Sequence, residues 1–154
     1  MRAAARPAVE VSVRRLEGAR DLACPERATA LASGFDLRAA VDGSVELAPG
    51  QRLLIPSGIA IALPPGYEAQ VRPRSGLALR HGLTLLNSPG TVDSDYRGEI
   101  CVVLVNLGQD PVRIERGDRI AQLVVQQVPG VVLREVGALP GTERGAGGFG
   151  HTGR

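Results

Sequence analysis

The chain has 154 residues, which is enough for one domain with a substantial core and too few for two. All 18 of its basic residues are arginine, so chemistry that needs a lysine, such as a P-loop, a Schiff base or a Ser-x-x-Lys nucleophile, is excluded. The formal net charge of +2 is too small to argue for a nucleic-acid partner.

The cysteine and histidine residues predict no protein-built zinc site. Cys24 and Cys101 lie far apart, and His81 and His151 form no His-Glu-x-x-His motif. The first twelve residues lack the apolar run of a signal peptide, and no apolar stretch approaches transmembrane length. We therefore expect a cytoplasmic, reducing setting and no membrane partner.

Turn signals and short apolar stretches alternate along the chain. Pro-Gly occurs five times, and each occurrence predicts a turn. The stretches between these turns alternate with period two or are continuously apolar, and the predicted strands cover residues 9–13, 59–63, 67–72, 100–105, 120–128 and 131–136. A helical turn is expected only near residues 75–80. The predicted fold is all-β, a distorted jelly roll or β-sandwich over residues 1–137.

The last eleven residues, 144–154, contain five glycines. Such a segment pays a large entropy cost to order, yet it allows close backbone approach to phosphate oxygens. Arg144 adds charge, Thr152 a hydroxyl, and Phe149 a face on which a base can stack. The alternative is a frayed end without function. We expect residues 138–154 to be a flexible lid over a nucleotide.

Two polar clusters interrupt the predicted strands. Arg74, Ser75 and Gly76 open the predicted helical turn, where a guanidinium, a hydroxyl and free N–H groups suit an anion; a solvated loop is the alternative. Asp93 and Asp95 point to the same face of an extended segment. Asp93 is a candidate general base or ligand of a metal-bound water, and Asp95 a candidate partner of Arg97, unless both acids only cap a loop.

A third cluster covers residues 116–123. Asp118 and Arg119 are expected to hold a turn together, and they lead into a strand that is otherwise apolar. Gln122 is the polar residue of that strand, so its amide requires a hydrogen-bond partner or an opening in the structure.

Five segments in this order resemble the signatures of the trimeric deoxyuridine triphosphatase (dUTPase) family. They are GFDLRA at 34–39, PRSGL at 73–77, GTVDSDYRG at 90–98, GDRIAQ at 117–122 and the glycine-rich tail. Each motif alone is only suggestive, but five in order with similar spacing are specific. The resemblance implies a jelly-roll homotrimer with shared active sites. It implies hydrolysis of dUTP to dUMP and pyrophosphate, which keeps uracil out of DNA and supplies dUMP for thymidylate synthesis.

The resemblance also implies a role for each matching residue. Asp93 would deprotonate the attacking water, Asn87 would read uracil, and Tyr96 would pack on deoxyribose and exclude a 2′-hydroxyl. Mg²⁺ would be held mainly by the phosphates and waters, with Asp36 near its outer shell. The residues implied to bind the phosphates or to cover the nucleotide are Arg74, Ser75, Gly76, Gln122, Arg144, Gly147, Gly148, Phe149 and Thr152.

Two alternatives remain open on the sequence. A dCTP deaminase shares the fold but is expected to use a glutamate and to lack the glycine tail. A catalytically silent relative would act as a trimeric nucleotide-sensing protein, and loss of Asp93, Arg74 or the tail would signal it. None of these features is lost. The role of His151 stays open.

Overall fold

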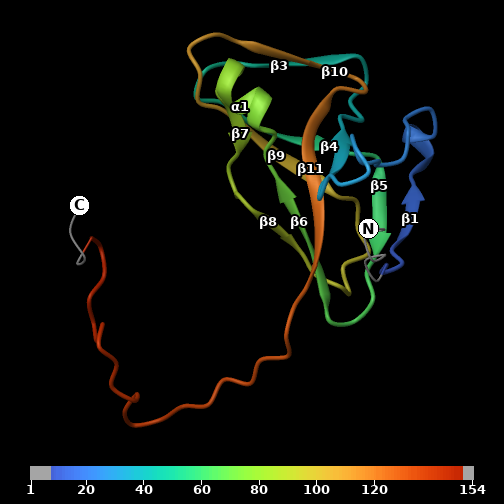
Figure 1. Cartoon of the computed structure of the whole chain (residues 1–154). Helices are drawn as coiled ribbons and strands as arrows, with labels where there is room; N and C mark the ends of the chain where they lie inside the picture. The colour runs from blue at the N-terminus through green and yellow to red at the C-terminus, as the bar shows by residue number, and fades with distance from the viewer. Residues whose placement is uncertain (1–7, 151–154) are drawn as a thin grey trace, which may run out of the picture.

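The computed structural model describes residues 8–150, and they form an all-β fold with a single short α-helix (Figure 1). Every strand pairing is antiparallel. The larger sheet has the strand order β2 (Phe35–Arg38), β11 (Arg119–Gln127), β6 (Tyr67–Arg72) and β8 (Gly90–Val92). The second has the order β4 (Arg52–Pro56), β9 (Cys101–Asn106) and β7 (Leu83–Leu85). The predicted jelly-roll class is confirmed.

Two further strand pairs complete the body. β1 (Ser12–Arg15) pairs with β5 (Ile59–Ala62), and β3 (Ser44–Leu47) pairs with β10 (Val112–Glu115). The first strand was expected at residues 9–13 but lies at Ser12–Arg15, where it pairs only with β5 and all four side chains are exposed. Backbone pairing, and not burial of an apolar face, therefore sets its bounds.

One aliphatic core joins the two larger sheets. On β6, Ala69 and Val71 are buried while Glu68 and Gln70 face outward, as the period-two pattern predicts. Val102 and Leu104 of β9 lie in the same core. β9 was expected to be buried on both faces, but Val103 is only half-buried in the single chain. The core fixes the register of the strands, because a one-residue slip would expose these side chains.

The predicted helical turn is confirmed as α1 (Ser75–His81). Arg74 precedes it with an extended backbone, and Gly82 ends it in the left-handed region at φ 68°. A Cβ at position 82 would lie 2.4 Å from the backbone nitrogen of Gly108. Glycine is therefore required there for its conformation and for the close approach of the neighbouring loop.

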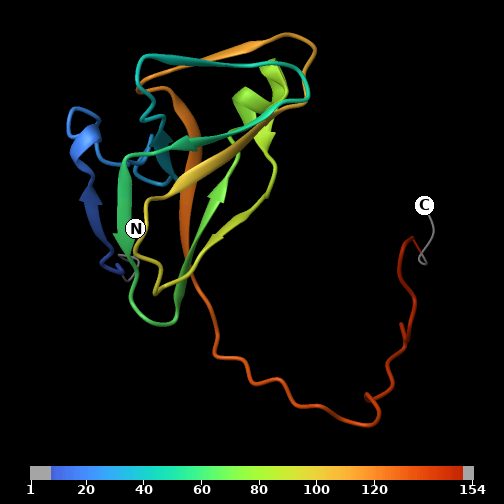
Figure 2. The ribbon, with the colours of Figure 1, turned by 180° about the vertical axis from the view of Figure 1, so that it is seen from behind.

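The predicted strand at 131–136 is wrong, because no strand or helix follows β11 within the described residues. After Val128, whose N–H donates to the Gly66 carbonyl at 2.8 Å, the chain leaves the sheets and runs away from the body (Figures 1 and 2). The side chains of Val132 and Leu133 are both 93% exposed. An apolar β-branched segment forms a strand only where another strand pairs with it, and the single chain offers none.

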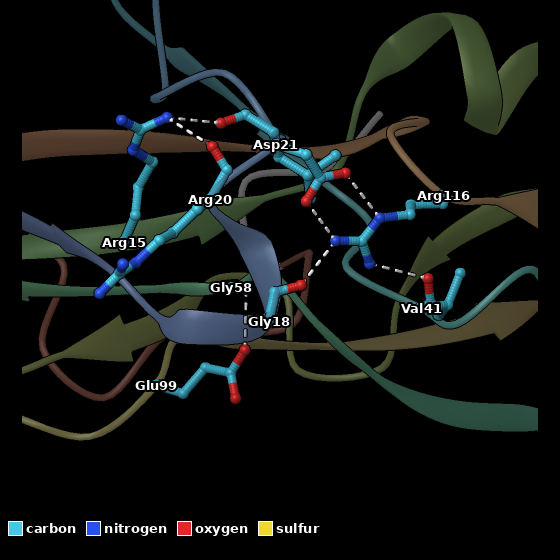
Figure 3. A network of polar contacts seen from close by, with 9 residues as sticks. Arg15, Gly18, Arg20, Asp21, Val41, Gly58, Glu99 and Arg116 are labelled. Carbon is cyan, nitrogen blue, oxygen red and sulfur yellow. Dashed lines mark hydrogen bonds and ion pairs between the residues drawn. The ribbon is translucent and has the colours of Figure 1, made fainter.

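An arginine ties the N-terminal loop to the turn between β10 and β11 (Figure 3). Arg116 donates from Nη2 and Nε to the two carboxylate oxygens of Asp21, at 2.6 and 2.9 Å. It also donates to the carbonyls of Gly18 and Val41. The hydrogen bonds from Arg116 hold the pKa of Asp21 below its ordinary value. This network fixes the turn that precedes Arg119.

Candidate active site

Strand pairing brings two of the sequence motifs together on the larger sheet. Asp36 of β2 lies opposite Gln122 of β11, and Gln122 lies opposite Arg72 at the end of β6. The chain then turns from β6 into α1, so Arg74 also reaches this edge of the sheet. Three segments that are far apart in the sequence thus meet around one carboxylate. We call Asp36, Arg74, Arg119 and Gln122 the polar edge.

The carboxylate of Asp36 pairs with two arginines. Its Oδ1 lies 3.2 Å from Nε of Arg74, and its Oδ2 lies 3.2 Å from Nη1 of Arg119. Nη1 of Arg74 also donates to the backbone carbonyl of Arg119 at 3.0 Å. Asp36 was assigned to the surroundings of a metal, whereas its contacts in the single chain are with guanidinium groups. These contacts with protein groups alone orient the guanidinium of Arg74.

Gln122 has the hydrogen-bond partner that the sequence required of it. Its Nε2 donates to the Pro73 carbonyl at 2.9 Å. A Cβ at position 34 would lie 2.3 Å from Oε1 of Gln122, so Gly34 leaves the space that this side chain occupies. The amide therefore links β11 to the segment that carries Arg74, and Ser75 and Gly76 follow in the first turn of α1.

The β10–β11 turn was expected to be held by both Asp118 and Arg119. The prediction is confirmed for Asp118, whose Oδ2 accepts the Glu115 N–H at 2.8 Å. It is wrong for Arg119, because its guanidinium reaches across to Asp36 on β2. Arg119 belongs to the quoted 117–122 motif, and sequence reasoning missed its place in the polar edge because the carboxylate partner lies 83 residues away.

A second group of motif residues lines a hollow of about 360 Å³, which we call the hairpin pocket. Asn87, Asp93 and Tyr96 are among its lining residues, together with Gly90, Thr91, Val92, Glu99 and Cys101. A Cβ at position 90 would lie 3.0 Å from Nδ2 of Asn87. The hairpin is thus tight at the point where a base was predicted to be read.

Tyr96 is folded back over its own loop at the edge of this pocket. Its backbone N–H donates to the Asp93 carbonyl at 3.2 Å, and its hydroxyl donates to the Glu99 carbonyl at 2.9 Å. A Cβ at position 98 would lie 2.4 Å from that hydroxyl, so Gly98 makes the ring position possible. The loop therefore holds Asp93 and Tyr96 in a fixed relation.

The Asp93 side chain is exposed, so it is accessible to a water and to a substrate. The suggested pairing of Asp95 with Arg97 is wrong, because the ion pairs among residues 8–150 do not include it. Nη1 of Arg97 instead donates to the carbonyls of Ser94 and Tyr96, at 2.6 and 2.9 Å. Local backbone acceptors satisfy this guanidinium better than a neighbouring surface carboxylate does.

Sequence reasoning also missed two residues of the hairpin pocket, Glu99 and Cys101. Burial raises the pKa of the Cys101 thiol, and the nearby Glu99 carboxylate raises it further. Cys101 is therefore a protonated lining group at neutral pH and not a nucleophile. The sequence signal for both was their position directly after the 90–98 motif.

The tail does not reach either group in the single chain. Nε of Arg144 donates to the Gly147 carbonyl at 2.7 Å, which closes a small loop within the tail itself. Gly148 follows this loop, and the Phe149 side chain is fully exposed. Figures 1 and 2 show the tail extending away from both sheets. Thr152 and His151 lie outside the described residues.

The polar edge suits an anion, because two guanidinium groups surround its one carboxylate, and it does not suit zinc. Within residues 8–150, no three His, Cys, Asp or Glu side chains gather in a possible metal cluster. The edge offers the single carboxylate of Asp36, which already contacts two arginines. Mg²⁺ keeps several waters and takes substrate phosphate oxygens as ligands, so a bound triphosphate and waters, and not this edge, would supply its ligands. No helix among the described residues is long and apolar enough to span a membrane.

Comparison with solved structures supports the fold. A Staphylococcus bacteriophage 80alpha dUTPase variant, solved with dUpNHpp, has a TM-score of 0.81 and 26% identity, and the match covers 94% of this chain and 99% of that one. Another structure of the 80alpha enzyme with this compound has a TM-score of 0.85 at 25% identity, with 94% and 99% covered. A phi11 phage dUTPase variant from S. aureus, described with a structural Mg(II) ion, shares the fold at a TM-score of 0.75 and 22% identity, with 84% and 97% covered.

Sequence comparison is more specific. The chain is 57% identical over 145 residues to a deoxyuridine 5'-triphosphate nucleotidohydrolase of Caulobacter vibrioides, covering 93% of this chain and 94% of that one. It is 56% identical over 145 residues to the corresponding protein of Caldanaerobacter subterraneus subsp. tengcongensis, with 94% and 98% covered. A family model described as dUTPase matches residues 20–153. The chain therefore belongs to the dUTPase family.

Proposed function

We propose that the protein is a dUTP diphosphatase, which hydrolyses dUTP to dUMP and pyrophosphate. The family match over residues 20–153 carries this conclusion, together with relatives that are named for the same reaction. The supporting geometry is a tight pocket beside an exposed carboxylate, and a separate edge where two arginines are held by Asp36.

Asp93 acts as the general base. A water forms a bond to the α-phosphorus and gives its proton to the Asp93 carboxylate, while the bond from the α-phosphorus to the bridging oxygen breaks and pyrophosphate leaves. A positioned base of this kind typically contributes about 10²- to 10⁴-fold to the rate. The exposure of Asp93 at the pocket wall leaves room for both the water and the phosphate.

The polar edge binds the phosphates. Arg74 is aimed by Asp36 and by the Arg119 carbonyl, and Gln122 is fixed on the Pro73 carbonyl. Ser75 and Gly76 add backbone N–H groups in the first turn of α1. Preorganised donors of this kind stabilise the charge that develops at phosphorus without reorganising during the reaction. Mg²⁺, held by the triphosphate and waters with Asp36 near its outer shell, would supply further charge neutralisation.

The hairpin pocket selects the nucleotide. Asn87 reads the uracil edge within a turn that has no space for a 5-methyl group. The ring of Tyr96 packs on deoxyribose and excludes a 2′-hydroxyl. The tail completes the site, with Arg144 at the γ-phosphate, Gly147, Gly148 and Thr152 along the phosphates, and Phe149 over the uracil.

We propose a homotrimer in which the tail of one subunit covers the site of another. In the single chain the tail runs away from both the polar edge and the hairpin pocket, so a site built only from one chain lacks its lid. Exposed Val132 and Leu133 would find a partner on a neighbouring subunit. A reducing cytoplasmic setting agrees with two free cysteines in the described chain.

One assay tests the function against its alternatives. The protein is incubated with Mg²⁺ and either dUTP or dCTP, and both pyrophosphate and ammonia are followed. Pyrophosphate from dUTP supports the proposal. Ammonia from dCTP would instead identify a deaminase, and the absence of both products would identify a non-catalytic nucleotide-binding protein.

A further inference from the structure

We infer that Glu99 is a positioning residue for Tyr96, and that it sets the discrimination against ribonucleotides by fixing the end of the Asp93–Tyr96 loop. This inference rests on the proposed function. The link consists of two hydrogen bonds. The Tyr96 hydroxyl donates to the Glu99 carbonyl at 2.9 Å, and the Glu99 carboxylate accepts the Gly58 N–H at 2.7 Å.

The first bond ties the ring to backbone and not to another side chain. Tyr96 is 46% exposed, so packing alone does not determine where its ring lies. Its hydroxyl follows the position of the Glu99 carbonyl, and Gly98 leaves the ring room to lie there. Any shift of residue 99 therefore moves the ring of Tyr96, which lines the pocket.

The second bond ties residue 99 to a rigid part of the body. Gly58 lies between β4 and β5 at φ 71°, and a Cβ there would lie 2.1 Å from Cβ of Ala19. Its carbonyl accepts the Leu16 N–H at 2.8 Å. Because the backbone of Gly58 is fixed from both sides, its N–H is a stationary donor for the Glu99 carboxylate, as Figure 3 shows.

The neighbouring residues strengthen this attachment. The backbone N–H and the hydroxyl of Ser57 both donate to the Ile100 carbonyl, and the Ile100 N–H donates to the Ile59 carbonyl at 2.9 Å. All three side chains are buried. The loop is thus anchored at Ile100, and the Glu99 carboxylate extends this anchor by one residue toward Tyr96. Loss of the carboxylate would free residue 99, whose own carbonyl accepts the Tyr96 hydroxyl.

The test compares kcat/KM for dUTP and UTP in Glu99→Ala, Glu99→Asp and Glu99→Gln. The alanine removes the acceptor, and the aspartate is one methylene too short to reach Gly58. Both should lower the dUTP-to-UTP preference by about tenfold, the effect of one charge-assisted hydrogen bond. The glutamine keeps an oxygen at the same reach and should restore most of the preference. Gln51→Ala removes another side-chain acceptor of a turn N–H, at a residue that does not line the pocket, and should leave the preference unchanged.

A double variant separates positioning from general stability. Because Glu99 acts through the ring, Tyr96→Ala combined with Glu99→Ala should lose no more preference than Tyr96→Ala alone. An unchanged preference in folded Glu99→Ala or Glu99→Asp protein would overturn the inference. So would a folded glutamine variant whose preference is as low as that of Glu99→Ala, since the bond to the Gly58 N–H would then not determine the preference. Wild-type protein that does not hydrolyse dUTP would overturn the proposed function itself.

Discussion

Asp36 and Arg74 form an ion pair of 3.2 Å between Oδ1 and Nε, and this pair joins strand β2 to the residue that precedes helix α1. The side chains of Asp36 and Arg74 are 15% and 28% exposed, so water screens the pair only in part. Arg119 approaches the other carboxylate oxygen. One acid thus sets the direction of two cations that belong to different motifs.

Asp36→Asn should therefore lower turnover more than it lowers binding. The asparagine keeps the shape but loses the charge that orients Arg74 toward the phosphates, and a misplacement of about 1 Å can cost about 10²-fold in rate. We expect kcat for dUTP to fall by about 10- to 100-fold. Nucleotide affinity should change less, because removing a negative charge beside the phosphate site offsets the poorer orientation of Arg74.

The matched control for this change is Glu115→Gln. It breaks the Arg113–Glu115 pair of 3.1 Å, whose side chains are 67% and 62% exposed. Exposed pairs of this kind contribute little, so steady-state kinetics should match the wild type. A kcat for Asp36→Asn equal to that of the control would show that Arg74 needs no such orientation.

Asp93→Asn should abolish most turnover while nucleotide binding stays largely intact, because the amide has the shape of the carboxylate but cannot accept the proton. Loss of a general base costs about 10²- to 10⁴-fold. Pyrophosphate release measures turnover, and calorimetry with dUMP measures binding. Asp110→Asn, at an exposed loop position that does not line the hairpin pocket, is the control. Near-normal turnover in Asp93→Asn would mean that another group is the base.

Asp21→Asn should remove a pH-dependent part of the stability. Hydrogen bonds from Arg116 lower the pKa of Asp21 in the folded chain from its ordinary value of 3.8. The stabilisation is therefore fully present above the unfolded pKa and is lost as the pH falls through the lowered folded pKa. Urea midpoints of wild type and variant should differ at neutral pH, and the difference should begin to shrink as the pH falls below about 4. A constant difference down to pH 2, roughly, would contradict this linkage.

The sequence predicts the parts of the fold that depend on local periodicity. Ala69 and Val71 are buried on β6 as the alternation requires, and α1 ends at Gly82, where the backbone is left-handed. The segment 131–136 has the same apolar character as these strands but forms none in the single chain. No strand among the described residues pairs with this segment, and composition carries no information about whether a pairing partner is present.

The candidate site likewise contains residues that local motifs identify and contacts that local motifs do not reveal. The sequence motifs identify Arg74, Asp93 and Gln122 as candidate site residues, because those residues lie within recognisable segments. The pairing of Arg119 with Asp36 joins residues 83 positions apart, and the bond from Gly58 to Glu99 spans 41. Contacts of this length depend on the strand register, which local patterns do not determine.

Subunit sharing predicts that two inactive variants complement each other. Asp93→Asn protein lacks the base but has the tail, and protein truncated before Arg144 has the base but lacks the tail. We expect each to be inactive alone. The two are unfolded together in equal amounts and refolded, the distribution of mixed trimers is measured by native mass spectrometry, and pyrophosphate release from dUTP is then assayed.

Random threefold assembly makes about three quarters of the trimers mixed. If each tail covers the next subunit around the ring, every mixed trimer contains one site with both an intact Asp93 and an intact tail. Since that is one site in three, activity should recover to roughly one quarter of wild type. If each tail instead closed over its own Asp93, no intact site could form in any mixture. Mixed trimers without recovered activity would thus reject shared sites while leaving the family assignment untouched.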